Sequence, residues 1–203
     1  IGYTIGTFLD TFKDTKNAPG LVLKVNGLND SEIDRYEIVN KIQIIQDSIK
    51  YKESLPPIYL LHGELSDRSL NTLYNDPRIK AMVSFTKGEG FGRSLMEFAS
   101  LGKPVICSGW SGPTDFLSTK HSAIVGGSLE YVHPSASNNY ILQNAYWFTP
   151  DTQQAVFALQ NMYSNYDYWK SLATTYIERI PKKYSLQRMG ERLSTLLSRY
   201  FNI

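Results

Sequence analysis

The feature of this 203-residue sequence that most constrains its fold is a series of short apolar runs separated by segments with helical signals. Strand-length runs that alternate with helices indicate βαβ units, and strands this uniformly apolar are typical of a parallel sheet covered on both faces. The runs are LVLKV (21–25), PIYLLH (57–62), AMVSF (81–85), PVICS (104–108) and SAIV (122–125). We therefore expect an α/β fold with a doubly wound, parallel, Rossmann-like sheet.

The segments between these runs carry helix signals of their own. Residues 3–14 place large apolar side chains at the spacing of one helix face. A capping box that begins at Ser31 predicts a helix over 31–49, since its side chain and that of the third following residue satisfy free backbone N–H groups. Further helices are predicted over 66–74 and 92–101, which completes the alternation of strand and helix.

After residue 126 the alternation stops and helical signals dominate. The sequence Thr-Pro-Asp at 149–151 predicts a helix start, and two more helices are expected near 167–179 and 185–201. We expect the whole chain to be a single domain in which residues 150–203 form a C-terminal helical extension. The last helix carries an apolar stripe that packs either on its own sheet or on a further domain, made of Leu186, Met189, Leu193, Leu196, Leu197 and Tyr200.

Composition excludes several classes of protein. With 42% apolar and 20% charged residues, the chain has material for a core and is not expected to be disordered. Lysine and arginine number 21 against 19 acidic residues, so bulk charge gives no case for a nucleic-acid or membrane-surface partner. A single cysteine, Cys107, cannot form an internal disulfide, and the three histidines do not lie at zinc-site spacing. No metal site is expected.

The ends of the sequence bear on location and completeness. No apolar run approaches the roughly 20 residues that span a bilayer, and the N-terminal IGYTIGTF lacks the layout of a signal peptide. We therefore expect a cytoplasmic protein. Because the sequence begins at Ile1 without an initiator methionine or a leading strand, we also expect it to be part of a longer polypeptide.

The densest chemical signal is the stretch that follows the third apolar run. There the predicted strand enters a glycine-rich turn at 88–92, GEGFG, and then passes directly into a helix. Glycines let backbone N–H groups approach a ligand, and a helix N-terminus supplies unpaired donors with a positive dipole end. This arrangement predicts a phosphate or diphosphate site at the carboxyl end of the sheet. The alternative is that the glycines make only a tight strand-to-helix turn.

Two carboxylates, Glu89 and Glu97, lie on either side of the helix start. At 1.5 Å of rise per residue they stand roughly 10–12 Å apart. That separation exceeds the ~5–9.5 Å of a glycoside-hydrolase pair but suits the two ends of a nucleotide-sugar, with a hexose at one and a ribose at the other. The alternatives are that Glu97 pairs with Arg93 and that Glu89 is a turn residue favoured by the helix N-terminus.

These residues carry a resemblance to a known family. The stretch KGEGFGRSLMEFASLGKPVICSGWSGPTDFL resembles the signature of retaining nucleotide-sugar glycosyltransferases of the GT-B fold, of the group 1 or family 4-like type. That signature is Glu, seven residues and Glu, followed by Gly-x-Pro-Val-Ile and a Gly/Ser-rich loop. The later WFTPD is similar to a Trp-x-x-Pro-Asp step in one branch of these enzymes. The resemblance covers nearly the whole chain and is to the C-terminal, donor-binding domain.

The resemblance implies a role for each matching residue. Glu89 would be the catalytic residue facing the hydroxyls of the transferred sugar, and Glu97 would bind the ribose. The loop after the second run would border the base, and Lys24 would partly replace phosphate-binding basic residues that the family carries before the point where this chain begins. The other implied donor-binding residues are Gly90, Phe91, Gly92, Arg93, Ser94, Leu95, His62 and Gly63.

The same resemblance implies the partners of the reaction. The donor would be a nucleoside-diphosphate sugar, used without a cofactor or metal because basic side chains and the helix dipole neutralise the diphosphate. The acceptor is not indicated and is a glycan, a lipid, a protein or a nucleic acid. In the family an N-terminal domain binds the acceptor and usually carries a catalytic histidine. We therefore expect this chain to bind a donor and to transfer little by itself.

Two other functions compete with this one. A dinucleotide-dependent oxidoreductase would need G-x-G-x-x-G, but the glycines at 88, 90 and 92 are followed by Arg93, and the next strand ends without an acid. A non-catalytic, Rossmann-like nucleotide-binding or interaction module is the other alternative, because a fold can outlive its chemistry. Cys107 is expected to be a small buried strand residue rather than a nucleophile.

Overall fold

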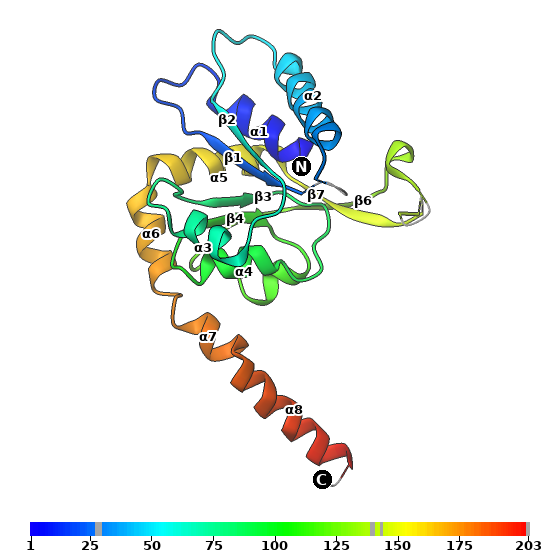
Figure 1. Cartoon of the computed structure of the whole chain (residues 1–203), viewed down its shortest axis with the longest axis vertical. Helices are drawn as coiled ribbons and strands as arrows, with labels where there is room; N and C mark the ends of the chain where they lie inside the picture. The colour runs from blue at the N-terminus through cyan, green and yellow to red at the C-terminus, as the bar shows by residue number, and fades with distance from the viewer. Residues whose placement is uncertain (27–29, 139–140, 143, 202–203) are drawn as a thin grey trace.

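The computed structural model describes residues 1–26, 30–138, 141–142 and 144–201 (Figure 1). The helices are α1 (Gly2–Phe12), α2 (Glu32–Ser48), α3 (Asp67–Asn75), α4 (Arg93–Ala99), α5 (Thr152–Ser164), α6 (Tyr166–Thr174), α7 (Arg179–Tyr184) and α8 (Leu186–Phe201). The strands are β1 (Leu21–Val25), β2 (Ile58–His62), β3 (Met82–Ser84), β4 (Val105–Ser108), β5 (Ala123–Val125), β6 (Gly127–Tyr131) and β7 (Tyr146–Pro150). Two short 3-10 helices span Gly112–Asp115 and Pro134–Ala136.

All five apolar runs form strands, and the pairing between them is parallel. β1 pairs with β2, placing Leu21 opposite Ile58, while β3, β4 and β5 pair in that order, with Ile106 opposite both Val83 and Ala123. The expected doubly wound α/β fold is thereby confirmed. The sheet differs from the expectation in one respect. Among the described strands it consists of two separately hydrogen-bonded parts, because β1 and β3 do not pair with each other.

The predicted helix starts are confirmed at two caps. The Ser31 hydroxyl accepts a hydrogen bond from the Asp34 N–H at 3.1 Å, and the Asp34 carboxylate accepts one from the Ser31 N–H at 3.1 Å. This reciprocal capping box begins α2. The Asp151 carboxylate accepts from the Gln154 N–H at 2.8 Å and begins α5 in the same way. Local hydrogen bonds thus fix both starts.

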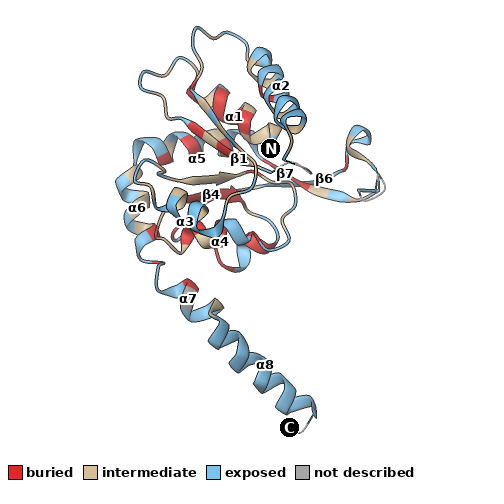
Figure 2. Cartoon of the chain, in the orientation of Figure 1, coloured by how far each residue is buried: buried red, intermediate tan, exposed pale blue. Residues whose placement is uncertain are grey.

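The core forms two clusters, one on each face of the three-stranded part. α1 and α5 cover one face, where Ile5 and Leu9 join Ile106. α4 and the C-terminal segment cover the other face, where Phe98 packs with Val105. β4 contributes alternate residues to both clusters and is buried along its whole length (Figure 2). The uniformly apolar run that predicted this strand therefore reflects burial on two faces.

An antiparallel hairpin, β6 and β7, was not predicted. Its register places Gly127 opposite Pro150 and Tyr131 opposite Tyr146. The ring centroids of the two tyrosines lie 4.3 Å apart. Every residue of β6 is exposed, so the strand lacks the apolar alternation by which a half-buried strand is recognised. The sequence therefore showed the end of the βα alternation but not the hairpin that replaces it.

The last helix projects away from the rest of the chain (Figure 1). Its apolar stripe is exposed, and Leu186 has the largest exposed fraction in the stripe, 87%. Figure 2 colours α8 as exposed along its length. The stripe therefore does not pack on the chain's own sheet, which removes one of the two alternatives. By contrast, Tyr176 and Ile180, just before α8, are buried in the second cluster.

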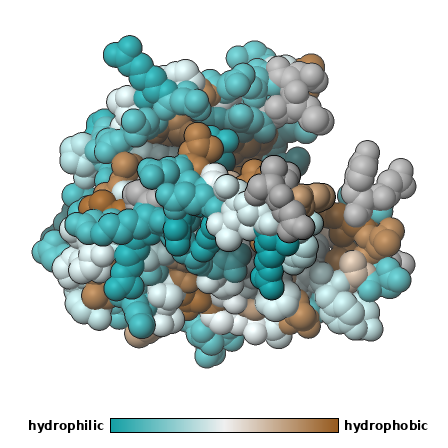
Figure 3. Space-filling view, turned by 90° about the horizontal axis from the view of Figure 1, so that it is seen from below, coloured by the Kyte–Doolittle hydropathy of each residue, from teal (hydrophilic) through white to brown (hydrophobic). Residues whose placement is uncertain are grey.

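Hydrophilic side chains cover much of one face of the molecule. Seen from the α8 side, hydrophilic side chains predominate and the apolar ones lie in small separate groups (Figure 3). Within the described ranges, no helix has both the length and the hydropathy that crossing a membrane requires.

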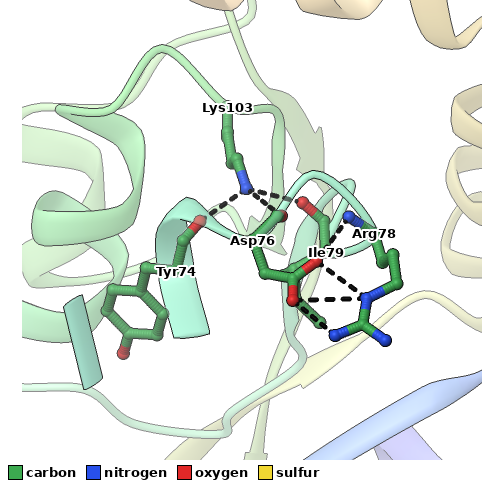
Figure 4. Close-up of polar contacts among 5 residues, drawn as sticks. All are labelled: Tyr74, Asp76, Arg78, Ile79 and Lys103. Atoms are coloured by element: carbon green, nitrogen blue, oxygen red, sulfur yellow. Dashed lines mark hydrogen bonds and ion pairs between the residues drawn. The ribbon is translucent and has the colours of Figure 1, made fainter. Parts of the chain in front are cut away.

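A partly buried cation ties the end of α3 to the start of β4. Figure 4 shows Lys103 directed at the turn after α3, where its Nζ donates to the carbonyl oxygens of Tyr74, Asp76 and Ile79, the last two at 2.8 Å. Carbonyl groups at a helix C-terminus carry partial negative charge, which favours a cation there. Burial lowers the pKa of Lys103, but the three acceptors compensate for its loss of solvent.

The carboxylate of Asp76 in the same turn predicts a specific acid dependence of stability. Arg78 donates to it through its backbone N–H at 2.8 Å and through Nη2 at 2.6 Å, which lowers the pKa of Asp76 from 3.8 to about 2. A depressed carboxyl pKa stabilises the fold above its ordinary value, and this contribution is lost as the pH falls through the folded value. Asp76→Asn should therefore be less stable than the parent at neutral pH, by a difference that shrinks between pH 3.8 and about 2.

Urea unfolding midpoints of both proteins, measured across this pH range, check the prediction. Arg78→Ala should reduce the same acid dependence, because hydrogen bonds from Arg78 are the largest causes of the shift. A difference between the parent and Asp76→Asn that does not change with pH would contradict the assignment.

Candidate functional site

The glycine-rich turn lies where expected, between the carboxyl end of β3 and the start of α4. Gly92 is the residue before α4 and has φ +83°, a left-handed conformation that strains other residues. A Cβ at Gly92 would also approach Cγ of Pro113 at 3.1 Å. At Gly88 and Gly90 a Cβ would meet no atom within 4 Å. The turn is therefore tight at Gly92 and open around Gly88 and Gly90.

Glu89 lies against the start of this helix. Its Oε1 accepts a hydrogen bond from the Gly92 N–H at 3.1 Å, and the residue is partly buried. A carboxylate is stabilised there by the free N–H groups and the positive end of the helix dipole. In this structure Glu89 thus has the contact expected of a turn residue, and it uses one of the donors at the helix start.

Glu97 lies one turn into α4 and pairs with Arg93. The Arg93 Nε donates to the Glu97 Oε1 at 2.6 Å, and this contact raises the pKa of Arg93. The Glu97 side chain is 37% exposed and that of Arg93 is far more so. Because the pair is solvated, it contributes little to the stability of the helix. The alternative partner named for Glu97 from the sequence is the one found here.

A second loop, after β4, packs directly on the first. The Gly112 N–H donates to the Glu89 carbonyl at 3.3 Å, and the Ser108 hydroxyl donates to the Thr86 carbonyl at 2.9 Å. A Cβ at Gly112 would lie 2.2 Å from the Gly90 carbonyl oxygen. The two loops therefore form one unit at the carboxyl ends of adjacent strands. The sequence shows Gly112 in a turn but gives no sign that only a glycine fits there.

The β6–β7 hairpin borders this unit and adds a cation that the sequence analysis did not assign. The Lys87 Nζ donates to the Thr149 hydroxyl at 3.2 Å and lies 4.1 Å from the centroid of the Trp147 ring. The Phe148 N–H donates to the Lys87 carbonyl at 2.8 Å, and Trp110 stacks on Phe148 with 5.9 Å between centroids. In the sequence, the only sign that Lys87 belongs to this site is its position directly before Gly88.

Lys24, His62 and Gly63 come together at the carboxyl ends of β1 and β2. The Lys24 Nζ donates to the Gly63 carbonyl at 2.6 Å and also to the Asn26 side chain. Gly63 has φ +95°, and its N–H donates to the Val25 carbonyl at 3.1 Å. The His62 Nε2 is buried and has no hydrogen-bond partner among the described residues. These three residues thus form a group on the two-stranded part of the sheet.

The predicted site residues therefore fall into two groups. The group from Glu89 to Glu97 lies on the three-stranded part, and the group around Lys24 lies on the two-stranded part. In the described ranges no hydrogen bond or ion pair joins them. Arg93 and Ser94 are exposed, whereas the Leu95 side chain is buried in the core, so Leu95 offers a ligand only its backbone. Both groups lie at carboxyl ends of parallel strands, where α/β folds bind ligands.

Cys107 is buried in β4, below the second loop. Burial raises the pKa of the Cys107 thiol to about 12, so the thiol is protonated at neutral pH and is not an activated nucleophile. Over the described part of the chain, no three His, Cys, Asp or Glu side chains are grouped in a way that could hold a metal ion.

Comparison with solved structures gives matches over almost the whole chain. HepE from Anabaena, in complex with UDP and glucose, matches with a TM-score of 0.61 and 12% identity over 94% of this chain and 44% of its own. The same protein in complex with UDP-glucose gives 0.60 and 13%, over 95% and 44%. Sucrose-phosphate synthase from Thermosynechococcus elongatus gives 0.65 and 15%, over 98% and 42%. No protein-family model matches the sequence, and no curated protein matches it significantly.

These matches establish the fold, since identities of 12–15% do not extend to activity. The chain spans less than half the length of the proteins it matches. The α/β arrangement described above, with parallel strands that alternate with helices, therefore corresponds to one half of the GT-B glycosyltransferase fold.

Proposed function

We propose that this chain is the donor-binding domain of a retaining glycosyltransferase, which binds a nucleoside-diphosphate sugar without a metal. The observation that carries the proposal is the match over 94–98% of the chain to GT-B structures, one of them solved with UDP-glucose. The Glu89–Glu97 pair supports it, because both residues lie on the loop and helix at the carboxyl end of β3. The acceptor is unassigned.

In this proposal the donor lies across the two stacked glycine loops. The space around Gly88 and Gly90 is open, so backbone amides there can approach the sugar closely. Amides of residues 92–95 face the diphosphate, with Leu95 contributing only its backbone because its side chain is buried. The cations of Lys87 and Arg93 lie on either side of the turn and would neutralise the charge of the leaving diphosphate.

The present contacts of the two carboxylates are compatible with donor binding. The pair of Glu97 and Arg93 is largely exposed to solvent and therefore weak, so vicinal ribose hydroxyls can replace it at small cost. Release of Arg93 would also free a guanidinium for the diphosphate. Glu89 would exchange its hydrogen bond with the Gly92 N–H for hydroxyls of the sugar, which leaves that N–H available to the donor. Lys24, His62 and Gly63 would border the base.

A non-catalytic nucleotide-binding or interaction module is the second candidate. The observation that favours it is that both carboxylates already have protein partners, as they would in a fold that had lost its ligand. The two candidates differ in whether the carboxylates discriminate between a nucleotide and its sugar conjugate. In either case we expect little transfer by this chain alone, because it corresponds to one half of the GT-B fold.

The proposal predicts different effects of Glu97→Ala and Glu89→Ala on binding. Glu97→Ala should weaken the binding of a nucleoside diphosphate by about 10- to 150-fold, because charged hydrogen bonds contribute roughly 1.5–3 kcal/mol. Glu89→Ala should leave the affinity for the free nucleotide unchanged and weaken only the binding of the nucleotide-sugar. Saturation-transfer NMR against UDP, GDP, ADP, their sugar conjugates and NAD identifies the ligand, and calorimetry with the ligand found gives both affinities.

Glu178→Ala is the matched control, since Glu178 pairs with Lys182 at the same helical spacing and lies outside the proposed site. Unchanged nucleotide affinity in Glu97→Ala would refute the ribose assignment. Equal losses of affinity for the nucleotide and the nucleotide-sugar in Glu89→Ala would contradict the assignment of the sugar to Glu89 and the ribose to Glu97. Binding of none of the nucleotides by the parent protein would favour the interaction module.

A further inference from the structure

A strip of exposed apolar side chains runs from the loop after β4 onto the β6–β7 hairpin. Leu129 lies opposite Phe148 in this hairpin. Tyr131 and Tyr146 form the pair two residues further on, so they lie on the same face. Phe148 is buried, and the ring of Trp110 stacks on it with an interplanar angle of 3°. The remaining residues, here called the hairpin strip, are each between 43% and 63% exposed: Trp110, Leu129, Tyr131 and Tyr146.

The charged side chains near the hairpin lie on its other face. Glu130 and Thr149 belong to that face, where the Thr149 hydroxyl donates to the Glu130 Oε2 at 2.7 Å. The Nζ of Lys87 lies over the Trp147 ring on the same side. In the sequence, residues 127–150 contain no lysine or arginine, and Glu130 is their one carboxylate. The hairpin strip is therefore neutral, which favours an uncharged ligand over a polyanion or an anionic membrane.

The exposed area of the hairpin strip limits the kind of partner it fits. A fully buried aromatic side chain covers about 150–250 Å², so four residues at these exposures offer roughly 300–500 Å². A stable protein interface needs about 800 Å² from each partner. A second copy of this chain therefore finds too little surface on the hairpin strip, whereas a narrow ligand can be held by it.

Exposed tyrosine and tryptophan rings suit a ligand that has both apolar and polar groups. One face of a sugar ring presents C–H bonds with partial positive charge, which pack on the negative face of an aromatic ring. The hydroxyl groups of the sugar can also bond to the tyrosine hydroxyls. Along β7 the two residues from Phe148 to Tyr146 span about 6.8 Å, so a linear saccharide can contact Trp110 and the tyrosine pair together.

The hairpin strip begins beside the glycine turn. Trp110 lies in the loop whose Gly112 N–H donates to the Glu89 carbonyl, and the Phe148 N–H donates to the Lys87 carbonyl at 2.8 Å. These bonds fix the base of the hairpin against the turn. The hairpin extends away from the body of the molecule in Figure 1, and one of the apolar groups in Figure 3 lies on the same side. A ligand on the strip therefore has one end close to the turn.

We propose that the hairpin strip binds an uncharged saccharide chain, whose sugar rings stack on Trp110, Tyr131 and Tyr146. One end of this chain lies beside the glycine turn, where the proposed donor site requires an acceptor. The role as acceptor rests on the proposed function, whereas binding of the saccharide does not. The inference thus assigns a ligand class to a surface that the donor leaves free.

Saturation-transfer NMR without nucleotide provides the test, with uncharged oligosaccharides of glucose, mannose, galactose and N-acetylglucosamine as probes. The parent protein should bind at least one of them. Tyr131→Ala should weaken that binding at least about fivefold, because one stacked ring is removed, and Tyr131→Phe should retain it within about twofold. Tyr168→Ala is the matched control, since Tyr168 is 59% exposed and lies on α6, and it should leave the affinity unchanged.

Binding of none of these saccharides by the parent protein would overturn the proposal. Equal losses of affinity in Tyr131→Ala and Tyr168→Ala would also overturn it, because the hairpin strip would then not be the binding surface. Binding to vesicles of phosphatidylcholine and phosphatidylglycerol, or a dimer in light scattering, that is lost in Tyr131→Ala would assign the strip to a membrane or to a second copy instead. Saccharide binding by a protein that binds no nucleoside diphosphate would refute the proposed function and support the hairpin strip as a saccharide site.

Discussion

Replacing Gly112 with alanine should destabilise the protein by about 2–4 kcal/mol and remove binding of the nucleotide-sugar donor proposed above. A Cβ at this position would lie 2.2 Å from the Gly90 carbonyl oxygen and 2.5 Å from the Phe91 Cα. Both are backbone atoms, so no change of rotamer relieves the clash. The loop after β4 would have to move away from the turn before α4, and the contact between Gly112 and Glu89 would break.

Urea unfolding measures the first effect and calorimetry with the nucleotide-sugar found by NMR measures the second. Gly88→Ala is the matched control, because a Cβ there meets no atom within 4 Å. It should change stability by no more than about 0.5 kcal/mol. If Gly112→Ala were as stable as Gly88→Ala, the two loops would not be in the close contact that the proposed donor site requires.

Phe98→Ala should destabilise the protein by about 3–5 kcal/mol. Phe98 is 1% exposed, and its ring meets that of Tyr74 edge to face with 5.4 Å between centroids. It lies in the cluster that joins α4 to β4 and to the C-terminal segment. Removal of the ring leaves a cavity that the surrounding strands and helices cannot fill, so both the transfer energy and the packing contacts are lost.

Phe157→Ala is the control for this substitution. Phe157 also lies on a helix, but it is 66% exposed, and its removal should cost no more than about 0.5 kcal/mol. Thermal or urea unfolding of the two variants distinguishes burial from residue type. A similar, small loss of stability in both variants would show that the second cluster contributes little to stability and that α4 is held chiefly by its loops.

Much of the fold could be predicted because its signals are local. The run PVICS at 104–108 identifies β4, since a strand buried on both faces must be apolar throughout. The capping box at Ser31 identifies the start of α2, because the hydrogen bonds that form it join residues three apart. The hairpin was missed for the opposite reason. β6 is exposed along its length, so its strand conformation depends on pairing with β7 rather than on its own pattern.

The candidate site divides in the same way. From the sequence alone, the glycines, Glu89 and Glu97 could be placed between a strand and a helix, because their spacing along one helix is fixed by its rise. The sequence does not determine which partner each carboxylate has. The structure shows Arg93 beside Glu97 and the Gly92 N–H beside Glu89. The Arg93–Glu97 pair is exposed, so the stabilisation from it is small enough for a ligand to replace it.

The sequence by itself determined the α/β class, the five parallel strands, the helix caps and the position of the glycine turn. Each follows from periodicity or from hydrogen bonds between residues near in the chain. Only the tertiary structure decided that Gly112 must be a glycine, that Lys87 lies beside the turn, and that the stripe on α8 is exposed. It alone also showed the break between β1 and β3. These features depend on atoms brought together from distant segments, and no local pattern records which segments will meet.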